Sequence, residues 1–389
     1  MSATFPTAKL CEIALLNPTL GGRLPEDELV SFVPMASVSA ETAKVETTLD
    51  RPYSEVSKGF TPFLSGDVLF AKITPCFENG KIAQALLPRR NGFGSTEFHV
   101  VRSRPEMSDA RYLHHYLRLN AVRVEGQRRM TGSGGQRRVP ASFLSELRVP
   151  VPRLEEQRRI AAILDQAETL RCQRRAALAQ LDSLTQSIFL DMFGEQMAFP
   201  LVALDQVCEL ITDGTHYTPT YADEGVIFLS AKNVTSGRID WERIKHIPED
   251  LHQELHKRVA PKFGDVLMAK NGTTGVAAIV DRDCTFDIYV SLALLRPSIR
   301  VSSVFLHAAL NSPLSKKQFN AALKGIGVPN LHLKDIRGSK IPIPQLPLQQ
   351  TFATRIQAIA ALKATHRTAL AELDALFASL QQRAFSGDL

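Results

Sequence analysis

Two glycine-rich loops carry the side chains best suited to contact nucleic acid. One reads Gly-Ser-Gly-Gly-Gln-Arg-Arg-Val-Pro over residues 132–140, and the other reads Lys-Gly-Ile-Gly-Val-Pro-Asn-Leu over residues 324–331. Glycine lets a backbone approach a phosphate closely, while arginine, glutamine and asparagine can pair bidentately with guanine or adenine edges. The alternative for each loop is an ordinary connection before a strand.

Both loops lie within basic blocks. Residues 101–150 hold ten Lys and Arg against four Asp and Glu, and residues 301–350 hold six against one, in a chain of net charge +6. Because each block precedes a helical stretch, we expect a phosphate-binding surface that was duplicated with its domain. The alternative is a pair of solvated basic faces that bind nothing.

Catalytic motifs are missing from the sequence. The nearest approach to the Asp/Asn-Pro-Pro-Tyr/Phe tetrad of amino-methyltransferases is Asn17-Pro18-Thr19-Leu20, and no G-x-x-x-x-G-K-S/T phosphate cradle occurs. His252 and His256 are four residues apart, but the glutamate is displaced from the H-E-x-x-H pattern and no third ligand is evident. We therefore expect a polar helix face there, with no metal site, no cofactor and no catalysis in the chain.

Composition and length are those of an ordinary soluble protein. Of 389 residues, 44% are hydrophobic and 22% charged. No run of about 18 apolar residues and no signal pattern occurs, so we expect a cytoplasmic protein that does not meet a membrane. The five cysteines lie far apart without a C-x-x-C pair, which predicts reduced and mostly buried thiols.

The chain repeats itself, and the spacing between the copies is constant within the two helical runs. Each globular stretch ends in a Pro-aliphatic-Pro sequence, at residues 150–152 and 342–344, and a long helical run follows. Within these runs residues 192 positions apart match, as Gln157 matches Gln349. Residues 66–72 also match residues 264–270, each predicting a turn and a short strand, and an Asn-Gly hairpin signal follows. These matches predict two copies of one unit.

The two runs predict long, paired helices. Residues 154 to about 193 contain no Gly or Pro, and apolar residues recur there with heptad spacing. If Ile160 is taken as position a of the heptad, position e is also apolar, as at Leu164 and Leu178. The apolar stripe is therefore broader than a simple helix seam, so a further partner could pack there. The residues expected in the helix-pair or partner interface are Ile160, Leu164, Leu170, Leu178, Leu181, Phe352, Ile356, Leu362, Leu370 and Leu373.

Connectivity predicts that these helices are antiparallel. A helix of about 38 residues makes a rod of about 57 Å, whereas the domain that joins the two helices is only about 38 Å across. Antiparallel helices need only short connections. The expected fold is α+β, with two similar mixed α/β domains separated by an antiparallel coiled coil and related by a pseudo-two-fold axis. The expected boundaries are 1–152 for the first domain, 153–196 for the first helix, 197–344 for the second domain and 345–389 for the second helix.

Several stretches together resemble a known family. They are residues 33–38 (Val-Pro-Met-Ala-Ser-Val), 66–81, 92–98 (Gly-Phe-Gly-Ser-Thr-Glu-Phe), 152–157 (Pro-Arg-Leu-Glu-Glu-Gln), 213–219 (Asp-Gly-Thr-His-Tyr-Thr-Pro) and 270–275 (Lys-Asn-Gly-Thr-Thr-Gly). On these residues the chain resembles the specificity subunits of type I restriction-modification systems, over nearly its whole length.

The resemblance implies a role in DNA recognition without catalysis. Each globular unit would be a target recognition domain that reads one half of a split double-stranded DNA site. The helix pair would fix the gap and dock two methyltransferase subunits. Methylation, S-adenosylmethionine binding and ATP-dependent translocation would belong to the methyltransferase and restriction subunits. The alternatives are a self-sufficient nuclease or methyltransferase and a two-headed protein-binding scaffold.

Under this resemblance the DNA face would comprise basic and amide side chains of the matched strands and glycine-rich loops. In the first half they are Lys72, Lys81, Arg128, Arg129, Gln136, Arg137 and Arg138. In the second half they are Lys270, Asn271, Lys324, Asn330, Lys334 and Arg337. We expect no catalytic or metal-binding residue among them.

Overall fold

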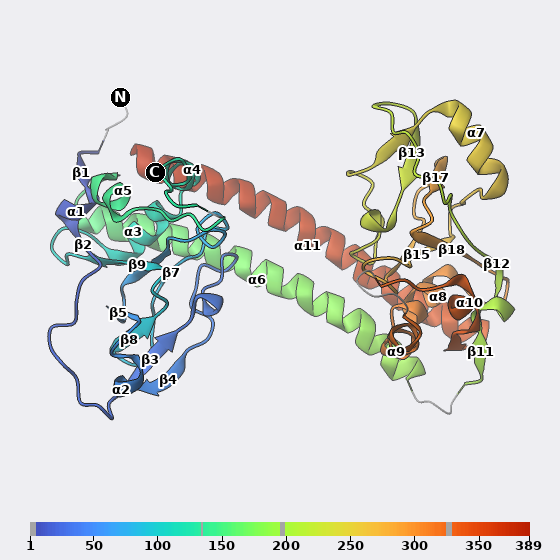
Figure 1. Cartoon of the computed structure of the whole chain (residues 1–389), viewed down its shortest axis with the longest axis horizontal. Helices are drawn as coiled ribbons and strands as arrows, with labels where there is room; N and C mark the ends of the chain where they lie inside the picture. Colours follow the sequence, from blue (N-terminus) through green and yellow to red (C-terminus); the bar gives the residue numbers. More distant parts are fainter. Residues whose placement is uncertain (1–4, 134, 195–198, 324–328) are drawn as a thin grey trace. The chain divides into compact units, whose positions relative to one another are not determined.

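The computed structural model describes residues 5–133, 135–194, 199–323 and 329–389. The chain divides into two compact units, one of Met1–Ala176 with Arg367–Leu389 and one of Ala177–His366. Two long helices, α6 (Leu154–Phe193) and α11 (Leu346–Ser386), run through both units (Figure 1). Each unit therefore combines a globular portion with one end of each long helix.

The first unit contains three antiparallel or mixed sheets, with the strand orders β2-β9-β6-β7, β4-β3-β8-β5 and β1-β10. Its strands are β1 (Thr7–Lys9), β2 (Ala14–Leu16), β3 (Leu29–Val33), β4 (Leu49–Pro52), β5 (Thr61–Leu64), β6 (Val68–Ala71), β7 (Ile82–Gln84), β8 (Asn91–Gly94), β9 (Phe98–Ser103) and β10 (Arg148–Pro150). Its shorter helices are α1 (Leu10–Ile13), α2 (Tyr53–Val56), α3 (Ala110–Leu117), α4 (Asn120–Arg128) and α5 (Ala141–Glu146), with the 3-10 turn η1 (Met35–Ser37).

The second unit has the strand orders β12-β18-β15-β16, β14-β13-β17 and β11-β19. Its strands are β11 (Leu201–Ala203), β12 (Cys208–Asp213), β13 (Val226–Leu229), β14 (Lys245–Ile247), β15 (Val266–Ala269), β16 (Ala277–Ile279), β17 (Phe286–Ile288), β18 (Leu292–Pro297) and β19 (Lys340–Pro342). Its shorter helices are α7 (Glu249–Arg258), α8 (Ser303–Leu310), α9 (Pro313–Ala322) and α10 (Leu333–Gly338), with the 3-10 turns η2 (Leu204–Gln206) and η3 (Ala231–Asn233).

The two units repeat one topology. The four-stranded order β2-β9-β6-β7 returns as β12-β18-β15-β16, and the parallel pair β3–β8 returns as β13–β17. The matched Gly-Asp sequences lead into β6 and β15, and each pairs with the strand after its Asn-Gly turn in an antiparallel hairpin. The prediction of two similar mixed α/β domains is therefore confirmed.

Within each unit the ends of the two long helices run antiparallel, as predicted. In the first unit Arg159 donates to the carbonyl of Leu389 at 2.8 Å, and Arg171 donates to Asp374 at 2.6 Å. In the second unit Lys363 lies 2.8 Å from Asp182, and the rings of Phe189 and Phe352 are 5.7 Å apart. In both units a later residue of α6 meets an earlier residue of α11.

The helices bury a different stripe from the predicted one. Ile160, Leu164 and Phe352 are buried and belong to the hydrophobic cores of their units. Leu170 and Leu362, however, are 46% and 52% exposed, so the helix seam does not cover them and they remain candidates for the partner interface alone. The other predicted interface residues, Leu178, Leu181, Ile356, Leu370 and Leu373, are half-buried.

The observed buried stripe differs from the predicted one because each helix is rotated about its own axis relative to the predicted orientation. Positions a and e face the core of the unit, as Ile160 and Leu164 do, while the leucines at position d turn outward. Leu184 and Leu376 at the other d positions are likewise 43% and 50% exposed. A wide apolar stripe in the sequence shows that a helix is amphipathic. The surfaces that pack against the helix determine which part of the stripe is buried.

The cysteines are free, but the expectation of buried thiols was wrong. Cys11 is exposed, and Cys76, Cys172, Cys208 and Cys284 are half-buried. Burial raises the pKa of the Cys208 thiol to about 12, so this thiol stays protonated and unreactive at neutral pH. Among the described residues, no helix combines the length and the apolar character that crossing a membrane requires.

Candidate nucleic-acid interface

In the first unit the glycine-rich loop lies against the end of strand β6. The amide of Val139 donates to the carbonyl of Lys72 at 2.8 Å, and Ile73 forms a bridge with Arg138. The Thr74 hydroxyl donates to the carbonyl of Gly135 at 2.7 Å. Two segments about 60 residues apart in sequence thus form one surface.

The turn of this loop requires glycine. Gly132 has a φ of +122°, in the left-handed region that side chains disfavour. A Cβ atom at this position would lie 2.6 Å from the carbonyl oxygen of Gln136. The glycine therefore allows residues 131–138 to fold back on themselves, with mutual backbone hydrogen bonds between Thr131 and Arg138.

Four exposed arginines cluster in and just before this loop. The side chains of Arg128 and Arg129, at the end of α4, are 74% and 66% exposed and share Glu125. Arg137 contacts Glu78 at 3.2 Å, and Arg138 pairs with Glu97 at 2.8 Å. Gln136 is exposed beside them.

Each of these arginines retains donors for a further anion. A guanidinium carries five N–H donors, and Arg138 gives only its Nε and Nη2 groups to Glu97. The hydrogen bond from Arg138 lowers the pKa of the Glu97 carboxyl, so this partner stays ionised at neutral pH. The ion pair with Glu97 therefore orients Arg138 and leaves the N–H donors of its Nη1 group available to a ligand.

The two predicted lysines of the first unit have mainly local roles. Lys81 donates to the carbonyl of Met35 at 3.0 Å, which ties η1 to the hairpin after β6. Lys72 is half-buried, and its amide donates to the carbonyl of Glu97 at 2.9 Å. Both lie at the edge of the loop surface and are weaker candidates than the arginines.

The second unit brings the equivalent segments together in the same way. The amide of Leu331 donates to the carbonyl of Lys270 at 2.8 Å, and Asn271 forms a bridge with Asn330. The amide of Gly272 donates to the carbonyl of Pro329 at 3.2 Å. Lys324, another predicted contact, lies outside the described residues.

Lys270 does not belong to an exposed basic surface. Its side chain is 9% exposed, and its ammonium lies 2.7 Å from the buried carboxylate of Asp213. A buried charge of this kind is held by its partner, because separating the two would leave Asp213 uncompensated. We therefore withdraw Lys270 from the candidate contacts.

The remaining predicted residues of the second unit face outward to different degrees. Lys334 and Arg337 are exposed on α10, where Arg337 also donates to the carbonyl of Ile211 at 2.6 Å. Asn330 and Asn271 are half-buried. The Oδ1 atom of Asn330 is buried without a hydrogen-bond partner, so the amide is not fully satisfied by the protein.

Tyr217 is a candidate contact that sequence reasoning missed. Its side chain is 85% exposed in the loop after β12, next to His216 and four residues from Asp213, the partner of Lys270. The loop is held by the amide of Thr215, which donates to the carbonyl of Ile288 at 3.1 Å. The signal in the sequence was its position within residues 213–219, a segment that carries the family resemblance but assigns no role to the tyrosine.

Other histidines serve the fold. His115 contacts Asp165 at 2.8 Å, and Arg111 contacts the same carboxylate at 3.2 Å, so α3 is tied to α6. His252 and His256 were expected to form a polar helix face without a third ligand. The structure corrects this, because Asp287 of β17 lies within hydrogen-bonding distance of both rings.

Comparison with known proteins identifies both halves of the chain. The family model described as the type I restriction modification DNA specificity domain matches residues 22–180 and again residues 199–375. The MjaVIII specificity subunit of a type I restriction enzyme from Methanocaldococcus jannaschii is 24% identical over 345 residues, which cover 78% of this chain and 80% of that protein. The EcoAI specificity subunit from Escherichia coli is 36% identical over 181 residues, 46% of this chain. The match spans only 31% of that protein.

Two solved structures share the fold. One, from work on complex assembly and conformational transition of the type I R-M system, superposes with a TM-score of 0.60 at 21% identity, covering 100% of this chain and 99% of that one. The other, the S subunit of a type I restriction-modification system from M. genitalium, gives a TM-score of 0.55 at 15% identity, covering 98% and 96%. At these identities the likeness concerns the fold.

Proposed function

Because the chain belongs to the family of type I restriction-modification DNA specificity domains, we propose that it is the sequence-specific DNA-binding subunit of such a complex. Each recognition domain, at residues 1–152 and 197–344, reads one half of a bipartite double-stranded target. The helices within residues 153–196 and 345–389 set the gap between the halves. The chain carries no catalysis of its own and directs methyltransferase and restriction subunits to the site.

The observation that carries this proposal is the duplicated loop arrangement. In both units the described residues at the end of the glycine-rich segment, 135–139 in the first unit and 329–331 in the second, lie against the end of the same strand of the same sheet, β6 or β15. Exposed cations lie beside it in each unit, on α4 and the loop in one and on α10 in the other. A common backbone with different side chains suits two readers of different half-sites.

The proposed contacts divide by chemistry. Arg128, Arg129, Lys334 and Arg337 are exposed cations suited to phosphates, which position a protein on a duplex without reading its sequence. Gln136, Arg137 and Arg138, and in the second unit Asn271, Asn330 and Tyr217, carry groups that can hydrogen bond to base edges as well as to the backbone.

The long helices suit a spacer. The 40 residues of α6 make a rod of about 60 Å, which corresponds to at most about 17 base pairs. The exposed leucines Leu170 and Leu184 recur 192 residues later as Leu362 and Leu376. Leu170 and Leu376 belong to the first unit, and Leu184 and Leu362 belong to the second. We infer that the exposed leucines of each unit dock one methyltransferase subunit.

Charge reversal in the loop tests the DNA face. With the chain in complex with its methyltransferase subunits and a duplex carrying the motif found methylated in cells, Arg137→Glu with Arg138→Glu should weaken binding at least about tenfold. The slope of log affinity against log salt concentration should become less steep by about two, since two phosphate-neutralising charges are lost.

The matched control reverses two exposed cations elsewhere in the same unit. Arg23→Glu with Lys58→Glu makes the same change in net charge. If both double variants lose affinity equally, the effect is one of net charge and the loop is not the DNA face. If neither the affinity nor its salt dependence changes in the Arg137 and Arg138 variant, these residues are not part of the DNA interface.

A further inference from the structure

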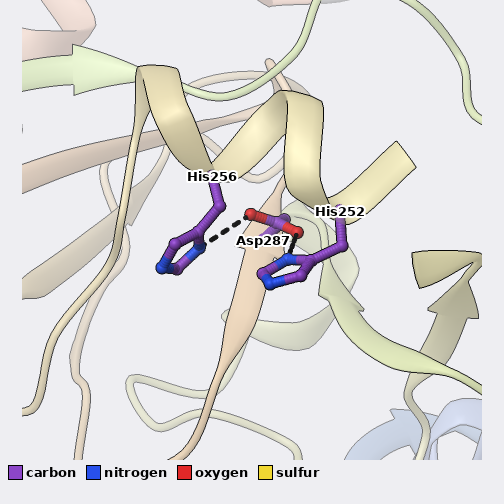
Figure 2. A group of neighbouring side chains, drawn as sticks. All are labelled: His252, His256 and Asp287. Carbon is purple, nitrogen blue, oxygen red and sulfur yellow. Dashed lines mark hydrogen bonds and ion pairs between the residues drawn. The ribbon is translucent and has the colours of Figure 1, made fainter. Parts of the chain in front are cut away.

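Two histidines and an aspartate converge in the second unit, between α7 and β17. His252 and His256 lie one turn apart on α7, so their rings leave the same side of the helix. Asp287 comes from the neighbouring strand β17 (Figure 2). The Nδ1 atom of His252 is 2.7 Å from one carboxylate oxygen, and the Nδ1 atom of His256 is 3.3 Å from the other.

The spacing of these groups is close to that of a metal site. One potential ligand atom from each of the three residues lies within 4.8 Å of the others. Ligands about 2.0–2.1 Å from a tetrahedral zinc ion lie roughly 3.3 Å from one another. The contact of His256 already has this length, and that of His252 would lengthen by about half an ångström through small ring movements.

The donor set also suits such an ion. Two imidazoles and one carboxylate, with the fourth position left to water, are a common zinc ligand set. The side chain of Asp287 is only 2% exposed, whereas those of His252 and His256 are 12% and 33% exposed, so an ion can enter from the histidine side. A cavity of about 20 Å³, enough for one water molecule, is lined by Asp287 and Arg258 but by neither histidine, so it is not part of the ligand cluster.

The charge of Asp287 gives a second reason. Within the described part of the chain, its ion pairs are with these two histidines alone. Arg258, which lines the nearby cavity, is directed to the carbonyl of Gly214 and to Asp213 instead. A buried carboxylate faced only by imidazoles at neutral pH would be compensated more fully by a divalent cation.

Helix α7 is attached to its unit mainly by polar contacts, which is a third reason for a metal ion at this position. None of its ten residues is buried, so hydrophobic packing contributes little to holding this helix on its unit. The helix is joined to β17 by the two histidine contacts with Asp287, and to the loop after β12 by Arg258. An ion shared between α7 and β17 would strengthen the attachment of the helix at these contacts.

We propose that His252, His256 and Asp287 bind a divalent transition metal ion, with zinc as the best fit, and that the ion fastens α7 to β17. Each histidine ligates through Nδ1, the ring nitrogen that faces Asp287 in the structure. Asp287 supplies the third ligand and the compensating negative charge. The metal site rests on the three side chains alone and does not depend on the proposed DNA-binding function.

The test uses the full chain, freed of metal by a chelator, and zinc chloride alone as the probe. Calorimetry should show one saturable binding event per chain, which His252→Gln with His256→Gln abolishes and His332→Gln, at an exposed histidine outside the cluster, preserves. Cobalt(II) in place of zinc should give a spectrum without thiolate charge-transfer bands, which separates this site from the five cysteines.

Hydrogen exchange supplies a readout specific to α7. With zinc at about 100 times its dissociation constant, opening of α7 that releases the ion should slow by about 100-fold in the wild-type chain and remain unchanged in the double variant. Circular dichroism establishes that the double variant is folded. The proposal is overturned if no zinc binds, if binding survives in the double variant, or if bound zinc leaves exchange of α7 unaltered.

Discussion

Buried carboxylates explain why the Gly-Asp sequence occurs in both halves. Asp67 accepts two hydrogen bonds from Arg102, at 2.9 and 2.7 Å, and one from the amide of Leu64. Asp265 makes the same set with Arg296 and the amide of Lys262. Each aspartate therefore holds the turn before its strand against a neighbouring strand, a role unrelated to ligand binding.

Buried histidines make the stability of each unit sensitive to acid. His114 of α3 and His307 of α8 are each the fifth residue of equivalent helices. Burial lowers the pKa of both imidazoles below the ordinary value of 6.5. Both are therefore neutral in the folded chain, whereas the unfolded chain protonates them as the pH falls through about 6.5.

We predict that this stabilisation is complete above about pH 6.5 and is lost as the pH falls below it. At pH 5.5 the unfolding free energy should be lower than at pH 7.5, by at most on the order of 1 kcal/mol for each histidine. Urea unfolding at pH 7.5 and 5.5 measures the loss, which should be smaller in His114→Gln and unchanged in His332→Gln. An equal loss in wild type and His114→Gln would assign the acid sensitivity to other groups.

At the scale of elements, one buried glutamine fixes the start of each long helix. The Gln157 amide donates to the carbonyls of Met107 and Pro152, and its oxygen accepts from the amide of Asp109. Gln349 repeats the pattern with the carbonyls of Arg300 and Pro344 and the amide of Ser302. The helix is thereby joined to the segment before α3 or α8, which sets its direction from the globular portion.

Replacing this glutamine should loosen the junction. Gln157→Met keeps the length of the side chain but leaves one amide and two carbonyls without their partner, at a cost of about 2–4 kcal/mol in unfolding free energy. Denaturant unfolding of the chain measures this cost. Gln173→Met, at an exposed position of the same helix, should change stability by less than about 0.5 kcal/mol. Equal stability of the two variants would contradict the role of Gln157.

At the scale of the whole molecule, duplication separates what is shared from what differs. The sheets, the proline-containing edge strands β10 and β19 and the glutamine junctions recur in both units. The exposed side chains of the proposed DNA faces do not recur, because the first unit uses arginines of α4 and its loop and the second uses α10. Under the proposed function, each half could change its specificity without altering the scaffold.

Exchange of one domain tests this independence. When residues 1–150 are replaced by those of a relative, the methylated motif in cells should change in one half only, with the other half and the gap retained. Replacement of residues 197–344 should change the opposite half. Sequencing of modified bases reads both outcomes, and a change in both halves after a single exchange would refute separate recognition by the two domains.

The sequence alone determined the features that depend on local pattern. Heptad spacing without Gly or Pro located α6 from Leu154 to Phe193, and the internal match predicted the shared topology of the two units. The matched strands and the glycine-rich loops were also found from the sequence. Local propensity and repetition are encoded in neighbouring residues, so they can be read without coordinates.

Only the tertiary structure decided how side chains far apart in sequence meet. It buried Lys270 against Asp213, turned Leu170 and Leu362 outward and brought Asp287 to His252 and His256. A pattern shows that a lysine ends a strand or that a helix is amphipathic, but not which group packs opposite. Exposure, charge compensation and ligand sets arise from contacts across the fold, and those contacts determine which of the candidate residues remain free to bind.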